Sequence, residues 1–384
     1  MYDAAANFAK LVFEQVQRTP AENRGKPGPL DVVVVAAWRR PEFLLTSLRH
    51  VLAAKAAEEH EYIFVLDYDY DPICRAVAEA FPLPHKRIVH TPKHEFFNRG
   101  NSYNLLEGYR YAHMVARTAG SDLVYLIEED VWVARDYFVF HRLAHSDAHT
   151  SIVGIPPTVA AKIFQVVGFS IPLNDGEFGA DTAAAIAACS RNDAVGLALQ
   201  QAVVTRHHYT SVATSFDTVA LDTIAAHAKK VYYENPVEYI KSVWGPDGIP
   251  NFKPGDAIEQ DGLLNRQTQQ EGWYTLSPRC PRAFHAGFTG YNRLTKGVDK
   301  GGSDIALSFR ERYDQLAEMT PSELLAAGDN HCGGCHDVIP VPLDGFFATR
   351  LTYCPPLQPD GVISTANTGA LRGPAVSSDC NGVL

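Results

Sequence analysis

The sequence lacks any apolar run long enough to span a bilayer. Its first 20 residues also lack the basic start, compact apolar stretch and small-residue cleavage site of a signal peptide. We therefore expect a soluble, cytoplasmic protein with no membrane span. Excess positive charge is missing too, because the formal net charge is -10. An acidic chain has no global attraction for nucleic acid or anionic membranes, so any such partner would need a local basic groove.

Cysteine is scarce, and its seven copies are an odd number. Without a secretory signal, this argues against a disulfide framework. Cys332 and Cys335 belong to HCGGCH (331–336), which matches the c-type haem attachment pattern and also offers ligands for zinc. Haem attachment takes place outside the cytoplasm. A structural Zn²⁺ site, a local disulfide and a pair of free thiols are the other interpretations of this segment.

The first part of the chain does contain a regular pattern, in which short apolar runs alternate with segments of helical periodicity. An N-terminal helix is expected within 3–18. Strands are expected at 31–38, 61–69, 86–92 and 122–130, and helices between them at 41–55, 71–81 and 101–120. This alternation predicts an α/β fold with a mostly parallel sheet flanked by helices, in which ligands bind beyond the carboxyl ends of the strands.

The alternation breaks down after about residue 142. A strand is expected at 151–156, an alanine-rich helical insertion at 181–204, a strand or turn and then a helix at 211–230, a helix at 256–272, and a strand from 273. Beyond about residue 320 the chain is rich in Gly, Pro and Ser. We therefore divide it into an N-terminal helix and linker (1–30), two halves of one domain (31–140 and 141–320), and an irregular C-terminal extension (321–384).

Three acids, Glu128, Glu129 and Asp130, come directly after the apolar run of the fourth strand. Neighbouring like charges are costly at a strand end unless a cation neutralises them, and a hard divalent ion bound through oxygens would do so. Because side chains alternate along an extended chain, Glu128 and Asp130 are predicted to face the ion while Glu129 points elsewhere. The alternative is a solvated strand end with three surface acids.

This acidic stretch, with a short apolar link and then Asp136-Tyr137-Phe138, resembles the metal-binding motif of nucleotide-sugar glycosyltransferases with the GT-A fold. The N-acetylglucosaminyltransferase I type is the most similar, and the resemblance extends sparsely over residues 31–295. It implies a GT-A (Rossmann-like) fold and a hexosyltransferase activity. It also implies that Asp130 holds Mn²⁺ or Mg²⁺, which bridges the diphosphate of the donor.

The same resemblance implies donor-binding residues at other strand ends. A polar turn after the first strand matches Trp38-Arg39-Arg40, and an aspartate that reads uracil matches Asp67 first, with Asp69 or Asp71 as alternatives. These side chains equally suit a solvent-facing turn or a helix N-cap. Arg99, before an expected helix start, would meet phosphate. The nucleotide-sugar-binding candidates are Trp38, Arg39, Arg40, Asp67, Asp69, Arg99, Glu128, Glu129 and Arg282.

An inverting transfer also needs a base that takes the proton of the acceptor hydroxyl. The resemblance implies a carboxylate at the start of a helix, which EQDGLLNR supplies as Asp261, with Glu259 as the alternative. A following Arg-x-x-His loop is matched by PRAFHAG (281–287). Arg282 is therefore expected at the diphosphate and His285 as a further metal ligand, since imidazole suits Mn²⁺.

The resulting hypothesis is a metal-dependent, inverting glycosyltransferase that moves a sugar from a nucleotide-sugar donor, with a UDP-sugar favoured. The acceptor hydroxyl would belong to a glycan, a protein or a hydroxymethylated DNA base. One alternative is a nucleotidyltransferase that makes nucleotide sugars, but AAWRRPEF (36–43) lacks the glycine-rich phosphate loop expected there. Another is a zinc- or haem-binding protein organised around HCGGCH.

Overall fold

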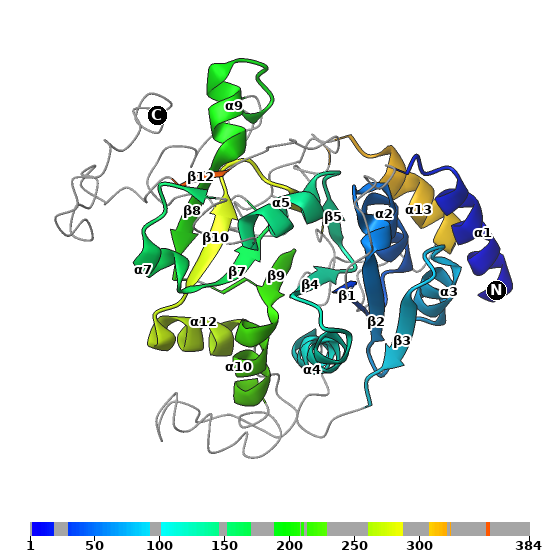
Figure 1. Ribbon diagram of the computed structural model, residues 1–384. Coiled ribbons are helices and arrows are strands. Elements are labelled where there is room, and N and C mark those ends of the chain that lie inside the picture. The colour runs from blue at the N-terminus through cyan, green and yellow to red at the C-terminus, as the bar shows by residue number, and fades with distance from the viewer. Residues whose placement is uncertain are drawn as a thin grey trace, which may run out of the picture.

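The protein is described by a computed structural model, shown in Figure 1. The residues that the structure describes are 2–18, 30–92, 101–145, 152–169, 188–207, 209–210, 213–228, 260–286, 307–320, 323 and 351–353. Four residues named by the sequence analysis lie outside them: Arg99, Glu259, Cys332 and Cys335. None of the described helices has the length and apolar character needed to cross a membrane.

Most of the described strands form one central sheet of ten. In chain order they are β1 (Asp31–Ala37), β2 (His60–Leu66), β3 (Lys86–His90), β4 (Leu123–Glu128), β6 (Ile152–Val153), β7 (Ile163–Val167), β8 (Ala202–Arg206), β9 (Thr214–Asp217), β10 (Tyr274–Pro278) and β12 (Leu351–Tyr353). Their order across the sheet is β3-β2-β1-β4-β9-β7-β10-β8-β12-β6. Strands β5 (Val131–Val133) and β11 (Ala283–His285) form a separate antiparallel pair.

Helices cover the sheet on both faces. They are α1 (Tyr2–Glu14), α2 (Pro41–Ala53), α3 (Pro72–Ala80), α4 (Asn101–Ala119), α5 (Tyr137–His145), α7 (Pro157–Ala160), α9 (Ala194–Gln201), α10 (Thr218–Ala228), α12 (Gln260–Glu271) and α13 (Phe309–Glu318), with a short 3-10 helix η1 (Ala57–Glu59). In Figure 1, α1, α3 and α13 gather at one end of the molecule, whereas α4, α10 and α12 lie together below the sheet. The α/β class predicted from the alternating pattern is confirmed.

The first four strands are the most regular part of the sheet. Strand β1 pairs in parallel with β2 and β4, and β2 pairs in parallel with β3. Every residue of β1 and β4 is buried, as expected for strands covered on both faces. Alternate residues of β1 enter two different cores: Val33 and Val35 pack towards α1, α2 and α3, whereas Val32 and Val34 pack towards α4. The parallel arrangement brings the carboxyl ends of these strands to one rim.

The second half of the sheet is mixed, and part of its secondary structure was not predicted. Strand β9 is antiparallel to both β4 and β7, and β8 is antiparallel to β10. The expected helix at 181–204 is wrong at its end, because α9 stops at Gln201 and β8 begins at Ala202. The β-branched residues Val203, Val204 and Thr205 favour a strand there, and they pair with β10. Strand β7 was also missed.

One disulfide is present among the described residues, between Cys189 and Cys280, whose Cα atoms are 5.7 Å apart. The sequence analysis did not predict this bond. It closes a loop of 91 residues between the segment before α9 and the end of β10. Closing a loop of this length restricts the unfolded chain, so the bond is expected to stabilise the second half of the sheet.

Candidate functional site

The candidate site lies where β1, β2 and β4 end, at the common rim of the parallel strands. Its side chains come from the turn after β1 (38–40), the turn after β2 (67–71) and the turn after β4 (129–130). Two backbone bonds hold the first two turns together: Asp67 N–H donates to Ala37 (3.2 Å) and Asp71 N–H donates to Trp38 (2.8 Å). The rim predicted from the strand pattern is therefore present in the structure.

An arginine lies between two acids of the triplet. Arg40 donates from Nε to Glu129 Oε1 and from Nη1 to Asp130 Oδ2, both at 2.7 Å. These two carboxylate side chains are almost completely buried, and the Arg40 side chain is only 13% exposed. Arg40 also lies over the ring of Phe43, 5.5 Å from its centroid. Arg40 thus supplies one positive charge to two carboxylates, at a place where the sequence analysis expected only a metal ion.

The prediction that Glu129 points away from Asp130 is wrong, whereas the predicted role of Glu128 as a metal ligand stays a prediction. Strand β4 ends at Glu128 and β5 begins at Val131, so Glu129 and Asp130 form a turn in which side chains no longer alternate. Both turn residues therefore reach Arg40. The Glu129 carboxylate also accepts a hydrogen bond from the backbone N–H of Trp38 (2.7 Å). Glu129 therefore joins the turn after β4 to the turn after β1, a role that the sequence did not predict.

The two acids respond differently to burial. Burial raises the pKa of Glu129, and the nearby charge of Arg40 offsets only part of this effect. Burial also acts to raise the pKa of Asp130, but the charges of Arg40 and His285 outweigh it and hold that pKa well below its usual range. The same two carboxylates raise the pKa of Arg40 despite its burial. Asp130 is therefore ionised throughout the neutral and mildly acidic range.

His285 reaches the site from a distant part of the sequence. It lies on β11, which pairs with β5 so that His285 is opposite Val131, next to the acid turn. Ala286 N–H donates to the backbone oxygen of Asp130 (2.8 Å), and His285 Nε2 lies 3.1 Å from Asp130 Oδ2. The structure thus brings together two residues that the sequence analysis named as metal ligands.

The second cluster at the rim joins the turns after β1 and β2. Trp38 donates its indole N–H to Asp69 Oδ1 (2.5 Å), and Arg39 pairs with Asp69 Oδ2 (3.2 Å). Arg39 also lies over the Trp38 ring, 5.3 Å from its centroid. The side chains of Arg39 and Asp69 are about one-third exposed, so this cluster meets solvent while the acid turn is buried.

The three aspartates after β2 have separate positions. Asp71 caps α3 by accepting from Ile73 N–H (2.8 Å), which is a structural role. Asp67 is 4% exposed and accepts from Tyr68 N–H (2.7 Å). Burial, with smaller contributions from the charges of Asp69 and Glu129, raises the pKa of Asp67 to about 6. Asp67 therefore changes charge in mildly acidic solution.

Arg282 does not reach the rim, which corrects the expectation that it contacts the diphosphate. Its side chain is completely buried, pairs with Asp136 (3.3 Å), and donates to the backbone oxygens of Cys280 and Gln200. It also lies over the ring of Phe140 at 4.9 Å. This arginine joins α5 and β11 inside the protein, so its role is structural.

Helix α12 begins at Gln260, so Asp261 lies in its first turn as predicted. The side chain of Asp261 is outside what the structure describes, so its predicted role as base remains a prediction. Further along the helix, Leu264 packs in the core beside α4, and Asn265 accepts from Tyr209 N–H (2.5 Å).

The donor set at Asp130 fits a divalent ion only in part. The described residues hold no group of three or more His, Cys, Asp or Glu side chains arranged for a metal. Asp130 Oδ1, however, is buried and accepts no hydrogen bond, and the neighbouring His285 side chain is 28% exposed. Magnesium-type ions in phosphate-binding sites take one or two protein ligands and complete their shell with substrate oxygens and water. Asp130 Oδ1, as a single carboxylate ligand, matches that pattern.

Comparison with known proteins gives limited similarity. No protein-family model and no curated protein matches the chain. A mannosyltransferase from Pyrobaculum calidifontis, PcManGT, solved with GDP-Man and Mn²⁺, has 13% identity over 86% of this chain and 88% of its own, with a TM-score of 0.37. The mannosyltransferase Ktr4p from S. cerevisiae has 10% identity over 44% of this chain and 49% of its own, with a TM-score of 0.22. TM-scores this low do not indicate the activity of this chain.

Proposed function

We propose that this protein is a metal-dependent glycosyltransferase of the GT-A type that uses a nucleotide-sugar donor. The observation that carries the proposal is the Asp130 carboxylate at the rim of the parallel strands. Its Oδ2 is held by Arg40 and His285, and its Oδ1 is buried without a hydrogen bond. A buried carboxylate oxygen without a partner is costly unless a ligand completes it.

Asp130, through Oδ1, is the residue that would hold Mn²⁺ or Mg²⁺, and His285 would join it as a neutral imidazole whose Nε2 has left Oδ2. Such an ion, when bound, supplies positive charge to the departing diphosphate. Arg40 orients the Asp130 carboxylate through Oδ2 and so leaves Oδ1 for the ion. The low pKa of Asp130 keeps this oxygen negative at neutral pH, as a metal ligand must be. No zinc site enters the proposal.

The nucleotide would lie along the turns after β1 and β2. Asp67, when ionised, would accept N–H groups from the base, and both uracil and guanine present such groups. A UDP-sugar stays our first choice. The partly exposed Arg39 and Trp38 would contact the ribose or phosphates, together with Arg99.

The transfer step needs a base for the acceptor hydroxyl. We assign this role to Asp261 in the first turn of α12, with Glu259 as the alternative. An ionised carboxylate takes the proton as the hydroxyl attacks the anomeric carbon, which inverts that centre. On this proposal, 31–140 bind the donor and 141–320 bind the acceptor, whose hydroxyl belongs to a glycan, a protein or a modified DNA base.

The proposal is tested with a panel of UDP- and GDP-sugars. Thermal stabilisation and slow donor hydrolysis are measured with Mn²⁺ and with EDTA, for the wild type, Asp130→Ala and Asp261→Asn. We expect Mn²⁺-dependent stabilisation by at least one donor. Asp130→Ala should abolish it, whereas Asp261→Asn should bind the donor normally and lose turnover.

Asp71→Asn is the matched control, because asparagine also caps a helix and the substitution removes one negative charge at the same rim. It should bind and turn over donor like the wild type. If no donor stabilises the wild type, or if Asp130→Ala binds as tightly as Asp71→Asn, the proposed function is wrong.

A further inference from the structure

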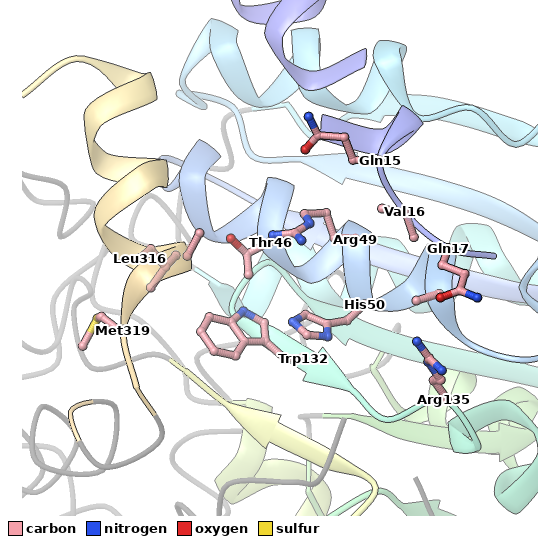
Figure 2. A pocket seen from close by; sticks show the side chains of 12 residues that line it. Gln15, Val16, Gln17, Thr46, Arg49, His50, Trp132, Arg135, Leu316 and Met319 are labelled. Atoms are coloured by element: carbon pink, nitrogen blue, oxygen red, sulfur yellow. The ribbon is translucent and has the colours of Figure 1, made fainter. Parts of the chain in front are cut away.

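A cavity of about 250 Å³ is lined by residues other than those of the candidate site. The segment directly after α1 (15–17), helix α2, strand β5 and the end of helix α13 contribute to its walls (Figure 2). The residues used below are Arg49 and His50 of α2, Trp132 of β5, and Arg135 just after β5. None of the residues that line the cavity takes part in the contacts of the rim, so this inference does not depend on the proposed function.

The indole N–H of Trp132 is the first feature that indicates a ligand. The side chain is 6% exposed, and its buried Nε1 has no hydrogen-bond partner. One face of the ring stacks on His50 at 5.5 Å, and Phe284 packs against it at 5.4 Å, so only the ring edge remains for a ligand. Figure 2 shows the indole nitrogen on the edge of the ring nearest Thr46. A buried N–H without an acceptor costs free energy unless a bound molecule accepts it.

The charge of the cavity wall is the second feature. Two guanidinium groups, Arg49 and Arg135, line the cavity, and its described lining residues include no aspartate or glutamate. Arg49 donates one N–H to the hydroxyl of Tyr313 (2.7 Å), which carries no negative charge in neutral solution. The described part of the wall is therefore positively charged, although the net charge of the chain is -10. It favours a negatively charged occupant.

His50 completes the polar part of the wall. Burial and the nearby Arg49 lower the pKa of His50 to about 3, so its ring is neutral in neutral solution. A neutral imidazole offers one donor and one acceptor. Its acceptor nitrogen would take a hydroxyl or water hydrogen, while its N–H adds to the donors of Trp132 and Arg49.

We propose that this cavity is a binding site for a small phosphate- or carboxylate-bearing molecule, held by Arg49, Arg135 and the indole N–H of Trp132. The shared chemistry is a compact anion with several acceptor oxygens. Arginine binds both groups through charge-assisted hydrogen bonds. The indole N–H can only donate, so its partner in the ligand must be an acceptor oxygen.

The test uses the full chain labelled with ¹⁵N-indole tryptophan. The four tryptophans give four indole N–H signals, and Trp132→Phe identifies the one from Trp132. Inorganic phosphate and succinate are titrated separately against sodium chloride of equal ionic strength. We expect a saturable shift of the Trp132 signal with at least one of the two anions, and which anion acts distinguishes a phosphate ligand from a carboxylate ligand.

Arg49→Gln should lower the affinity for the bound anion about tenfold or more, because the substitution removes charge-assisted hydrogen bonds. Arg110→Gln is the matched control, since Arg110 is an exposed arginine paired with Glu107 on α4. It should leave the affinity unchanged. The other three indole signals report whether each variant is folded.

The proposal is overturned if neither anion moves the Trp132 signal of the wild type beyond the shift given by sodium chloride. It is also overturned if Arg49→Gln, folded by the same signals, binds as tightly as Arg110→Gln. The wild-type titration decides the first point without any variant.

Discussion

Two arginines of this protein, Arg40 and Arg282, both pair with buried carboxylates, but they lie in different parts of the fold. Arg40 pairs with Glu129 and Asp130 at the end of the regular parallel strands. Arg282 pairs with Asp136 in the interior of the protein, where both side chains are almost completely buried. Around Arg282 the backbone oxygens of Cys280 and Gln200 and the ring of Phe140 complete the surroundings of the guanidinium.

The two clusters differ in what they leave for a ligand. At Arg40, the Oδ1 atom of Asp130 stays without a hydrogen bond, and the adjoining His285 is partly exposed. At Arg282, the arginine itself is completely buried and its cluster lies away from the rim. A buried ion pair alone therefore does not indicate a functional site. The position at the strand ends and the partly exposed His285 beside Asp130 are what distinguish the Arg40 cluster.

The largest expected effect is on stability, at the interior pair. Arg282→Ala leaves the buried Asp136 carboxylate without its cation, which should lower the free energy of unfolding by about 3–5 kcal/mol. Urea denaturation measures this loss. Donor binding per folded molecule should be unchanged, because Arg282 does not reach the rim. A large loss of donor affinity in folded Arg282→Ala would show that the two clusters are not separate.

An intermediate effect is expected from Asp67. Its folded-state pKa is raised to about 6, so the folded protein binds this proton more tightly than the unfolded chain does. The contribution of Asp67 to stability is complete below about pH 4 and is lost as the pH rises to about 6. A shift of this size corresponds to about 3 kcal/mol.

Asp67→Asn removes this titration. Urea denaturation between pH 4 and pH 7 should then show a smaller decline in stability with rising pH than the wild type shows. An unchanged pH dependence in Asp67→Asn would mean that Asp67 titrates near its ordinary pKa.

The smallest effect is expected at a solvent-exposed pair. Arg75 and Glu79 pair at 2.8 Å on α3, and both side chains are more than 40% exposed. Arg75→Gln should change the free energy of unfolding by less than about 0.5 kcal/mol, because exposed pairs contribute little. A loss as large as that of Arg282→Ala would contradict the contrast between buried and exposed arginines.

The sequence was informative where local pattern decides structure. Runs of β-branched apolar residues such as Val32–Val35 are typical of buried parallel strands. The rim where these strands end, and the residues on it, could therefore be predicted from the sequence. PRAFHAG pointed to His285, whose role as a metal ligand stays a prediction, and only the pairing of β5 with β11 explains why that residue meets Asp130. In the second half, β7 and β8 depend on partners distant in the sequence, which no local pattern shows.

The details of the site depended on geometry that the sequence does not encode locally. The alternation rule failed at Glu129 because the chain turns between β4 and β5. The sequence predicted that Arg40 contacts the nucleotide-sugar donor. Its pairing with two acids 89 and 90 residues away is a tertiary interaction that no local pattern shows. Arg282 shows the opposite error, since its neighbourhood in the sequence resembled a ligand-binding loop while its side chain is completely buried.

The central claim is that Asp130 holds a divalent ion for the diphosphate of a nucleotide. Its most direct test is the electron paramagnetic resonance signal of free Mn²⁺, titrated with the protein in the presence of UDP or GDP. The account predicts loss of the free-ion signal with the wild type and with Asp71→Asn, and an affinity at least about tenfold weaker with Asp130→Asn. Equal Mn²⁺ binding by Asp130→Asn and the wild type would contradict it.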